Sequence, residues 1–330
     1  KTEVLIGHGA AAAAEQLAPL LGVDAQELGA RMVGDESYVI IAEAVSPDTW
    51  RQVNALDIPG IEPDQRARRF YPAGYVAGNV VGFTYEGQRR ELIGASGLEF
   101  SQNDLLTGTD GQGSVEIGKK GAIIPTGERE EVAAVPGTDV RTTLDPDLQV
   151  VAQQAIDEVV SAQGADWGAV VVMEPSTGKV LVLADSSALD PSDPLASQDK
   201  DRESRCVQAV FEPGSVGKVI TFAAALEEGA LTPEDAFTVP YTWVAANGQA
   251  FEDSHEHPVQ YLTAAQVLAE SSNVGTVQIG ERLSDEVRHR YIEAFGYNQL
   301  TGIELPGESA GLLTDWSEWD DRTRYTTMFG

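Results

Sequence analysis

The sequence predicts a chain of two domains with mixed α and β structure (α+β or α/β), in which a strand- and loop-rich N-terminal domain precedes an antiparallel sheet packed by helices. The 330 residues exceed the usual size of one domain. Hydrophobic residues make up 42% and charged residues 22%, as in folded globular proteins. In the second half of the chain, strand-like runs come first and helical patterns follow. We expect the domains to cover residues 1–145 and 146–330.

The first domain alternates short apolar stretches with turn residues. Residues 38–42 are predicted to form a strand, and residues 46–56 a short helix whose Ser-Pro opening supplies a cap and a first turn. Glycine is frequent over residues 58–127, and turns such as Asp110-Gly111 indicate hairpins and long loops.

The second domain is predicted to open with a strand over residues 140–144 and a helix over residues 148–160, where apolar residues have helical spacing. Two β-rich runs, residues 168–173 and 179–184, are joined by a Pro-Ser-Thr-Gly turn and predict a hairpin. Residues 186–204 are polar and indicate an exposed loop. Four helices are expected after that loop, over residues 216–228, 263–270, 274–283 and 285–295.

The charge balance argues against nucleic-acid partners. The chain has 52 acidic and 22 basic residues, and the resulting net charge of −30 repels phosphate backbones and anionic lipid surfaces. Cys206 is the only cysteine, so no internal disulfide and no cysteine metal site can form. No apolar run approaches the ~20 residues that span a bilayer. The chain opens at Lys1 with no signal peptide, and we expect a fragment freed from an N-terminal anchor.

Ser215 and Lys218 are the strongest candidates for catalysis. A Pro-Gly turn places Ser215 at the start of a helix, so that Ser215 and Lys218, three residues apart, share one helix face. A serine hydroxyl is a weak nucleophile until a neighbouring group takes its proton, and a lysine of lowered pKa can do so. The helix N-terminus adds positive potential where negative charge develops during acyl transfer. The alternative is an ordinary N-cap serine, with Lys218 on the solvated face.

The Ser-x-x-Lys spacing does not identify the site by itself, because it occurs three times. Ser176 and Lys179 lie in the predicted hairpin turn, and Ser197 and Lys200 lie in the polar loop. Only Ser215 follows a Pro-Gly turn and opens an apolar helix. The context therefore favours Ser215.

Ser271 and Asn273 form a second candidate pair. Thr263 and Gln266 fit a capping box, so a helix should run from there to about residue 270, where Ser-Ser-Asn interrupts two helices. A hydroxyl that relays protons and an amide that holds a substrate backbone both suit such a junction. The alternative is a polar turn between helices, and Ser101-Gln102-Asn103 repeats the same spacing in the first domain.

Two other residue pairs are candidate binding sites. His255 and His257 flank Glu256 and could ligate a metal, but no third histidine is near, which favours a solvated or hydrogen-bonded loop. Trp316 and Trp319 are predicted to be core or lid residues rather than a platform for a sugar.

Ser-x-x-Lys at a helix start, followed by Ser-x-Asn at a helix junction, resembles the motif set of penicillin-binding proteins and serine β-lactamases. The similarity extends along nearly the whole chain. Three stretches look like the N-terminal module of class B penicillin-binding proteins: residues 69–72, 94–100 and 106–111. Two more look like the join to, and the start of, their transpeptidase domain: residues 143–149 and 169–185.

Residues 211–226 and 269–275 most resemble division-specific proteins of the FtsI type from actinobacteria. One departure from the family pattern is the Lys-Thr-Gly motif, which does not occur in the 330 residues. We interpret this as C-terminal sequence that is missing from the chain rather than as a divergent site.

The resemblance implies a noncatalytic N-terminal pedestal and a serine β-lactamase-like transpeptidase domain that is incomplete at its C-terminus. In the implied reaction Ser215 attacks the penultimate D-alanine carbonyl of a peptidoglycan stem pentapeptide, and Lys218 accepts the serine proton. Ser271 relays protons to the leaving amine, and Asn273 orients the substrate backbone. No metal or organic cofactor is implied, and β-lactams would acylate the same serine.

The resemblance also implies a location on the extracytoplasmic side of the cell membrane, held by an N-terminal transmembrane anchor outside this chain. The implied partners are a membrane-embedded glycosyltransferase and other division proteins. A β-lactam sensor or a noncatalytic cell-wall scaffold is the alternative from another class. A β-lactamase is a second enzymatic alternative, which the long N-terminal module argues against.

Overall fold

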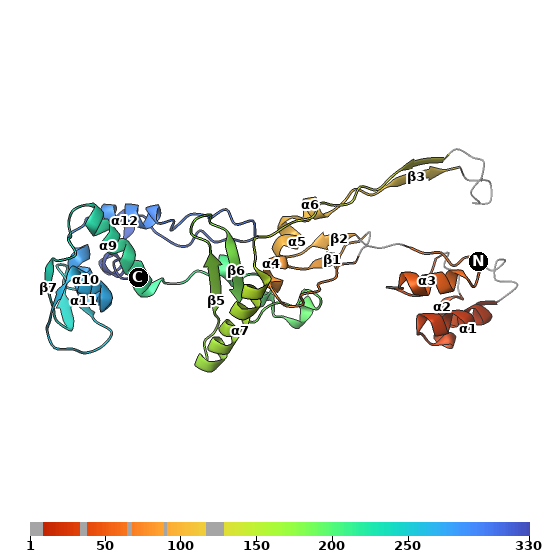
Figure 1. Ribbon diagram of the computed structural model, residues 1–330, viewed down its shortest axis with the longest axis horizontal. Coiled ribbons are helices and arrows are strands. Elements are labelled where there is room, and N and C mark those ends of the chain that lie inside the picture. The colour runs from red at the N-terminus through yellow and green to blue at the C-terminus, as the bar shows by residue number, and fades with distance from the viewer. Residues whose placement is uncertain (1–8, 34–37, 65–67, 89–90, 117–128) are drawn as a thin grey trace. The chain divides into compact units, whose positions relative to one another are not determined.

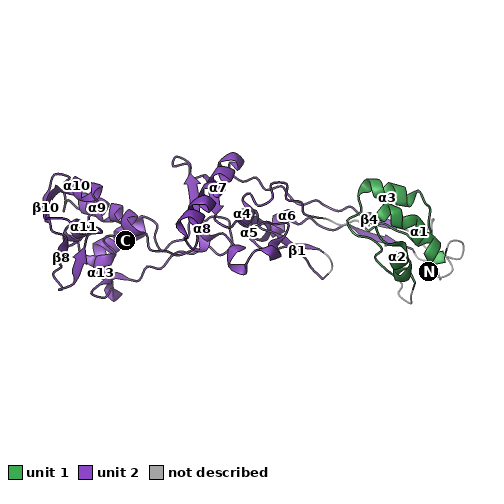
Figure 2. Cartoon of the chain, turned by 90° about the horizontal axis from the view of Figure 1, so that it is seen from below, with its two compact units in different colours: residues 1–68 green, residues 69–330 purple. Residues whose placement is uncertain are grey.

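The computed structural model describes residues 9–33, 38–64, 68–88, 91–116 and 129–330. The chain divides into two compact units, residues 1–68 and residues 69–330 (Figure 2). The second unit thus includes residues 69–145 as well as the predicted second domain. Within the described ranges, no helix combines the length and the apolar character needed to cross a bilayer.

In its described part, the first unit consists of three helices: α1 (Gly9–Leu21), α2 (Ala25–Arg31) and α3 (Pro47–Asn54). Leu17, Leu28 and Val53, one from each helix, are buried together in one apolar cluster. Ser46 Oγ accepts a hydrogen bond from the N–H of Thr49 at the start of α3. The helix predicted over residues 46–56 is therefore confirmed.

The strand predicted over residues 38–42 is wrong. These residues form no strand and have no partner strand in the described part of the chain. The carbonyl of Ile40 accepts a hydrogen bond from the guanidinium of Arg31, at the end of α2, and Ile41 packs against the helix cluster. The apolar residues that suggested a strand therefore serve a helical core, because strand propensity yields to tertiary packing.

The second unit begins with short elements, which are α4 (Gly78–Val81), β1 (Thr84–Glu86), β2 (Leu92–Gly94), α5 (Gly97–Ser101), α6 (Asn103–Leu106), β3 (Gln112–Val115) and β4 (Arg129–Val132). β1 pairs antiparallel with β2, and β3 with β4, so hairpins are present as predicted. The turn predicted at Asp110-Gly111 is wrong. It lies within the ladder, between the Thr109–Val135 bridge and the β3–β4 pairing.

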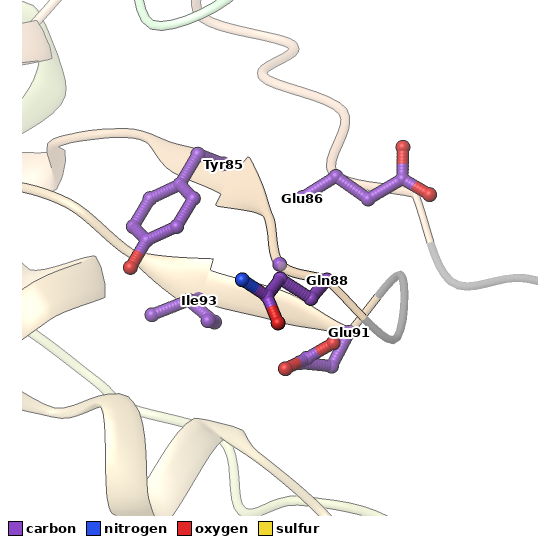
Figure 3. A pocket seen from close by; sticks show the side chains of 6 residues that line it. Tyr85, Glu86, Gln88, Glu91 and Ile93 are labelled. Atoms are coloured by element: carbon purple, nitrogen blue, oxygen red, sulfur yellow. The ribbon is translucent and has the colours of Figure 1, made fainter.

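A shallow hollow lies on the β1–β2 hairpin (Figure 3). Tyr85 of β1 and Ile93 of β2 contribute to its lining, together with the polar side chain of Gln88. None of the candidate catalytic residues lines this hollow.

α7 (Pro146–Gln163), β5 (Ala169–Met173) and β6 (Val180–Asp185) confirm the helix and the hairpin predicted for the start of the second domain. Asp145 caps α7 by accepting two backbone N–H groups of its first turn. The strand predicted over residues 140–144 is wrong. Thr143 Oγ1 donates to the carbonyl of Val180, and the N–H of Asp145 donates to the carbonyl of Leu181. One side-chain bond and one backbone bond thus take the place of a continuous backbone ladder.

Two buried glutamines fasten α7 to the rest of the unit. Gln149 donates to the carbonyl of Leu183 at 2.8 Å and accepts its N–H at 2.9 Å, so its amide pairs with β6 as a neighbouring strand would. Gln153 accepts the N–H of Ala77 at 2.8 Å and donates to the carbonyl of Tyr75 at 3.2 Å. Both side chains are almost fully buried, and they are hydrogen-bonded to each other.

The segment predicted to be a loop over residues 186–204 contains two short 3₁₀ turns, η1 (Pro194–Ala196) and η2 (Asp199–Asp201). It is not exposed throughout, because Leu189 is fully buried and its N–H donates to Asn79 Oδ1. The side-chain amide of Asn79 also donates, from Nδ2, to the carbonyl of Asp201. One buried asparagine therefore holds both ends of the loop.

The remaining elements are α8 (Arg205–Gln208), η3 (Gly214–Gly217), α9 (Lys218–Glu227), β7 (Ala236–Val239), β8 (Thr242–Val244), β9 (Ala250–Glu252), β10 (Gln260–Thr263), α10 (Ala264–Ala269), α11 (Asn273–Gly280), α12 (Asp285–Ala294), η4 (Trp316–Glu318) and α13 (Thr323–Thr326). β7 pairs antiparallel with β10, and β8 with β9. The four helices predicted after the loop are confirmed as α9 to α12. Of these, α10, α11 and α12 all pack against α9, as Figure 1 shows.

A core of apolar side chains holds these helices together. Phe222 of α9, Val239 of β7, Val267 of α10 and Ile279 of α11 are buried in one cluster. Of the two tryptophans expected to be core or lid residues, Trp319 is 4% exposed and packs in a second cluster, whereas Trp316 is 38% exposed and is not part of the core. The core thus fixes α9 against α10 and α11, whose adjoining ends carry the candidate catalytic residues.

Replacing Gln149 by leucine should lower the free energy of unfolding of this unit by about 2–4 kcal/mol, because the N–H and the carbonyl of Leu183 lose their partner inside the protein. The measurement is chemical denaturation of the full-length protein. Gln154→Leu, an exposed position on the same helix, is the matched control and should be nearly neutral. Equal unfolding midpoints for the two variants would contradict the role assigned to the Gln149 amide.

Candidate active site

Ser215 lies in a 3₁₀ turn that runs directly into α9. Gly214 precedes it with φ of +60°, a conformation that favours glycine. Because residues i and i+3 eclipse in a 3₁₀ turn, Ser215 and Lys218 lie on the same face. Ser215 is exposed, and its Oγ makes no hydrogen bond within the described ranges. Its predicted position at a helix start is confirmed.

Lys218 is buried although it carries an amine. The residue is 1% exposed, and Nζ donates to the carbonyl of Ser271 at 2.5 Å and to Ser271 Oγ at 3.0 Å. Burial lowers the pKa of Lys218 from its ordinary value, because water is removed from the charged form. The negative charge of Asp253 raises the same pKa and opposes part of that shift.

Ser271 occupies a strained position at the end of α10. Its N–H donates to the carbonyl of Leu268, and the N–H of Ser272 donates to the carbonyl of Val267, the two bonds of a Schellman motif. This motif requires a left-handed residue, and Ser271 has φ of +57° where glycine is usual. An L-residue in this conformation costs about 1–2 kcal/mol. Strain of this kind, kept at a polar junction, is typical of functional sites.

The next two residues begin α11. Ser272 caps that helix, because its Oγ accepts the N–H of Gly275 at 2.8 Å. Asn273 Nδ2 donates to the carbonyl of Glu252 at 3.1 Å. In the described part of the chain, no donor reaches Asn273 Oδ1. The Asn273 amide is thus held by one end and can accept a hydrogen bond at the other.

The other copies of the two motifs have different surroundings. Lys179 and Lys200 are both exposed, in contrast to Lys218. Ser101 Oγ donates to the carbonyl of Glu304, and Asn103 Oδ1 accepts the N–H of Gly94. The serine and the asparagine of this second Ser-x-Asn copy are therefore both hydrogen-bonded to backbone groups of other segments.

The structure brings the two candidate motifs together through Lys218 and Ser271, which are separated by 53 positions in the sequence. It also shows residues that the sequence patterns did not identify. Asp253 accepts hydrogen bonds from Ser272 Oγ at 2.8 Å and from His257 Nε2 at 3.0 Å. The prediction of a hydrogen-bonded loop around His257 is confirmed. No local pattern marks Asp253, because Ser272 and Val274, two of its three partners, lie about 20 residues away at the start of α11.

The chain matches two protein families in succession. The penicillin-binding protein dimerisation domain family matches residues 5–142, and the penicillin binding protein transpeptidase domain family matches residues 168–330. All four candidate catalytic residues fall within the second match.

Named relatives agree with this. Penicillin-binding protein PbpB of Mycobacterium tuberculosis is 35% identical over 91% of this chain and 43% of its own length. Peptidoglycan D,D-transpeptidase FtsI of Escherichia coli is 28% identical over 95% of this chain and 52% of its own length. The chain therefore spans about half the length of these curated relatives.

The crystal structure of penicillin binding protein 3 from Mycobacterium tuberculosis, complexed with aztreonam, resembles this chain with a TM-score of 0.68 and 34% identity, over 80% of this chain and 54% of that one. The expected fold, an N-terminal module before a transpeptidase-type domain, is confirmed. The order of the two family matches and the FtsI- and PbpB-named relatives show that the chain belongs to the class B penicillin-binding proteins.

Proposed function

We propose that the protein is a serine-type peptidoglycan D,D-transpeptidase, which cross-links stem peptides during septal wall synthesis through an acyl-enzyme on Ser215. The observation that carries the proposal is the buried Lys218 amine, on the same face as Ser215 and hydrogen-bonded to Ser271. The transpeptidase names of relatives and the aztreonam complex of a structural neighbour support it.

The hydrogen bonds of Lys218 suit a general base. A neutral amine has two N–H groups and one lone pair, and Nζ directs two donors to the carbonyl and the hydroxyl of Ser271. The lone pair then remains for the Ser215 hydroxyl. Burial favours this neutral form, because it lowers the pKa of Lys218.

The acylation step follows from this arrangement. Ser215 Oγ bonds to the penultimate D-alanine carbonyl carbon as its proton moves to Lys218 Nζ. The C–N bond to the terminal D-alanine then breaks, and Ser271 Oγ, bonded to Nζ, passes the proton to the leaving amine. The Ser215 N–H, in the first turn of its helix, is one donor for the oxyanion. Asn273 Oδ1 accepts a substrate backbone N–H. An amine from a second stem then takes the acyl group.

The remaining assignments rest on this function. We assign residues 1–145 to a noncatalytic pedestal and residues 146–330 to the transpeptidase domain, since Asp145 caps the helix that opens the latter. Peptidoglycan is assembled outside the cell membrane, so we place the active site on the extracytoplasmic side. We expect a membrane anchor to hold the protein there. A membrane-embedded glycosyltransferase that supplies glycan strands, and other division proteins, are the partners this role requires. β-Lactams are expected to acylate Ser215.

In the full-length protein, Ser215→Ala should reduce covalent labelling by a fluorescent penicillin by at least about 10³-fold, because the nucleophile is lost. Ser176→Ala and Ser197→Ala, the serines of the other Ser-x-x-Lys copies, are matched controls and should label normally. Gel fluorescence measures the adduct. Persistent labelling of the Ser215 variant would contradict the assignment. Rapid loss of the wild-type label would indicate a β-lactamase, and a stable label without cross-linking of lipid-linked substrate would indicate a sensor.

Ser271→Ala and Ser271→Gly should both reduce the cross-linking rate, by about 10²-fold, because both remove the proton relay. They should differ in stability. Glycine relieves the left-handed strain at this position and should give the higher melting temperature, by an amount equivalent to about 1 kcal/mol. Cross-linking assays and thermal unfolding measure the two effects. A Ser271→Gly variant that cross-links at the wild-type rate would exclude the relay.

A further inference from the structure

Asp253 accepts three hydrogen bonds from different parts of the chain. It follows β9, and its side chain is 9% exposed. Its carboxylate accepts Ser272 Oγ at 2.8 Å, the N–H of Val274 at 2.9 Å and His257 Nε2 at 3.0 Å. A buried carboxylate with this many donors is a fixed point of the structure, because each lost bond leaves a charged group unsatisfied.

One of these bonds comes from the Ser-Ser-Asn junction itself, through Ser272, and a second comes from Val274, the residue that follows it. Ser272 lies between Ser271, which binds Lys218, and Asn273. Asn273 is tied by its own amide to the carbonyl of Glu252, the residue before Asp253. Residues 252 and 253 therefore hold the two residues that directly follow Ser271, Asn273 through the carbonyl of Glu252 and Ser272 through the carboxylate of Asp253. A shift of Asp253 would move Ser271 and Asn273 together.

His257 completes the arrangement. Its Nδ1 lies 2.7 Å from the carbonyl of Pro258, and its Nε2 lies 3.0 Å from Asp253. Both partners are acceptors, and only the imidazolium can donate from both nitrogens. The ring also packs edge-on to Tyr241, whose hydroxyl donates to Glu252, and the carboxylate of Glu256 acts on the same tyrosine.

We propose that Asp253 and His257 are a positioning pair for the candidate active site, in which the Asp253 carboxylate anchors the Ser271–Asn273 junction and the imidazolium of His257 holds that carboxylate in place. The proposal rests on the function proposed above. Neither residue touches the reacting atoms. Both act through the junction, and Asp253 acts also through its charge on Lys218.

The pKa values of the two cations agree with this geometry. The pKa of His257 is raised above its ordinary 6.5, first by the bond to Pro258 and then by that to Asp253. Its contribution to stability is therefore complete below the unfolded pKa and is lost as the pH rises through the folded one. Asp253 raises the pKa of Lys218 against the effect of burial. Removing the charge of Asp253 should thus lower both values.

The first experiment compares acylation rates of the full-length protein by a fluorescent penicillin across pH. Asp253→Ala should lower the rate about 100-fold and His257→Ala about 10-fold, because misplaced groups lose much of the benefit of orientation. Asp253→Asn keeps an acceptor but no charge. It should move the acidic limb of the profile, set by Lys218, to lower pH, which a merely structural residue would not do. His255→Ala, an exposed histidine of the same loop, is the matched control and should match the wild type.

The second experiment separates this proposal from the proposed function, because it needs no activity. Histidine-selective NMR of the full-length protein should place the pKa of His257 above 6.5 in the wild type and lower in Asp253→Asn. The pair is overturned if that pKa is unchanged, or if folded Asp253→Asn and His257→Ala acylate like His255→Ala with the same acidic limb. A wild type that takes up no label contradicts the proposed function, while the titration still decides whether the pair exists.

Discussion

The candidate active site depends on a lysine amine that is removed from water and held by a serine far away in the sequence. Lys218 is 1% exposed, and both of its hydrogen bonds go to Ser271. Burial of a cation is unfavourable, so the fold accepts a cost at this point and gains an amine that tends toward its neutral form. The apolar cluster that packs α9 against α10 and α11 makes this burial possible.

Left-handed backbone conformations at Gly214 and Ser271 help to place Ser215 and Ser271 beside the Lys218 amine. Gly214 takes a left-handed conformation that lets the chain enter the 3₁₀ turn of Ser215, and glycine takes it without strain. Ser271 takes the same conformation at the end of α10, where its side chain makes it costly. Glycine occupies the first of these positions and serine the second, because only position 271 needs a hydroxyl. The cap of the following helix and its bonds to Asp253 stabilise the strained residue.

Much of this arrangement could be predicted from the sequence, because its elements are marked by local signals. Capping residues and apolar periodicity located α3, α7 and α9 to α12, and turn chemistry located the β5–β6 hairpin. The strands expected over residues 38–42 and 140–144 failed, because a short apolar run does not reveal whether a partner strand exists. β7 and β10 were missed because their pairing joins segments that are distant in the sequence. The β8–β9 hairpin was missed although Asn247-Gly248, between the two strands, is a local turn signal.

The candidate active site could also be predicted only in part. Ser215 and Ser271 occur in recognisable local contexts, but the spacing of each motif recurs elsewhere in the chain. The burial that separates Lys218 from the exposed Lys179 appears only in the structure. Asp253 had no local signal. Its role is defined by donors 4 to 21 residues away, which folding alone brings to one carboxylate.

Burial at this junction is what allows Lys218 to act as a base. Titration of Lys218 in the full-length protein, followed by NMR with lysine labelled at Cε, measures this directly. We expect a pKa below the ordinary 10.5. A pKa at or above 10.5 would leave the amine charged and without a free lone pair, and would contradict its role as the base.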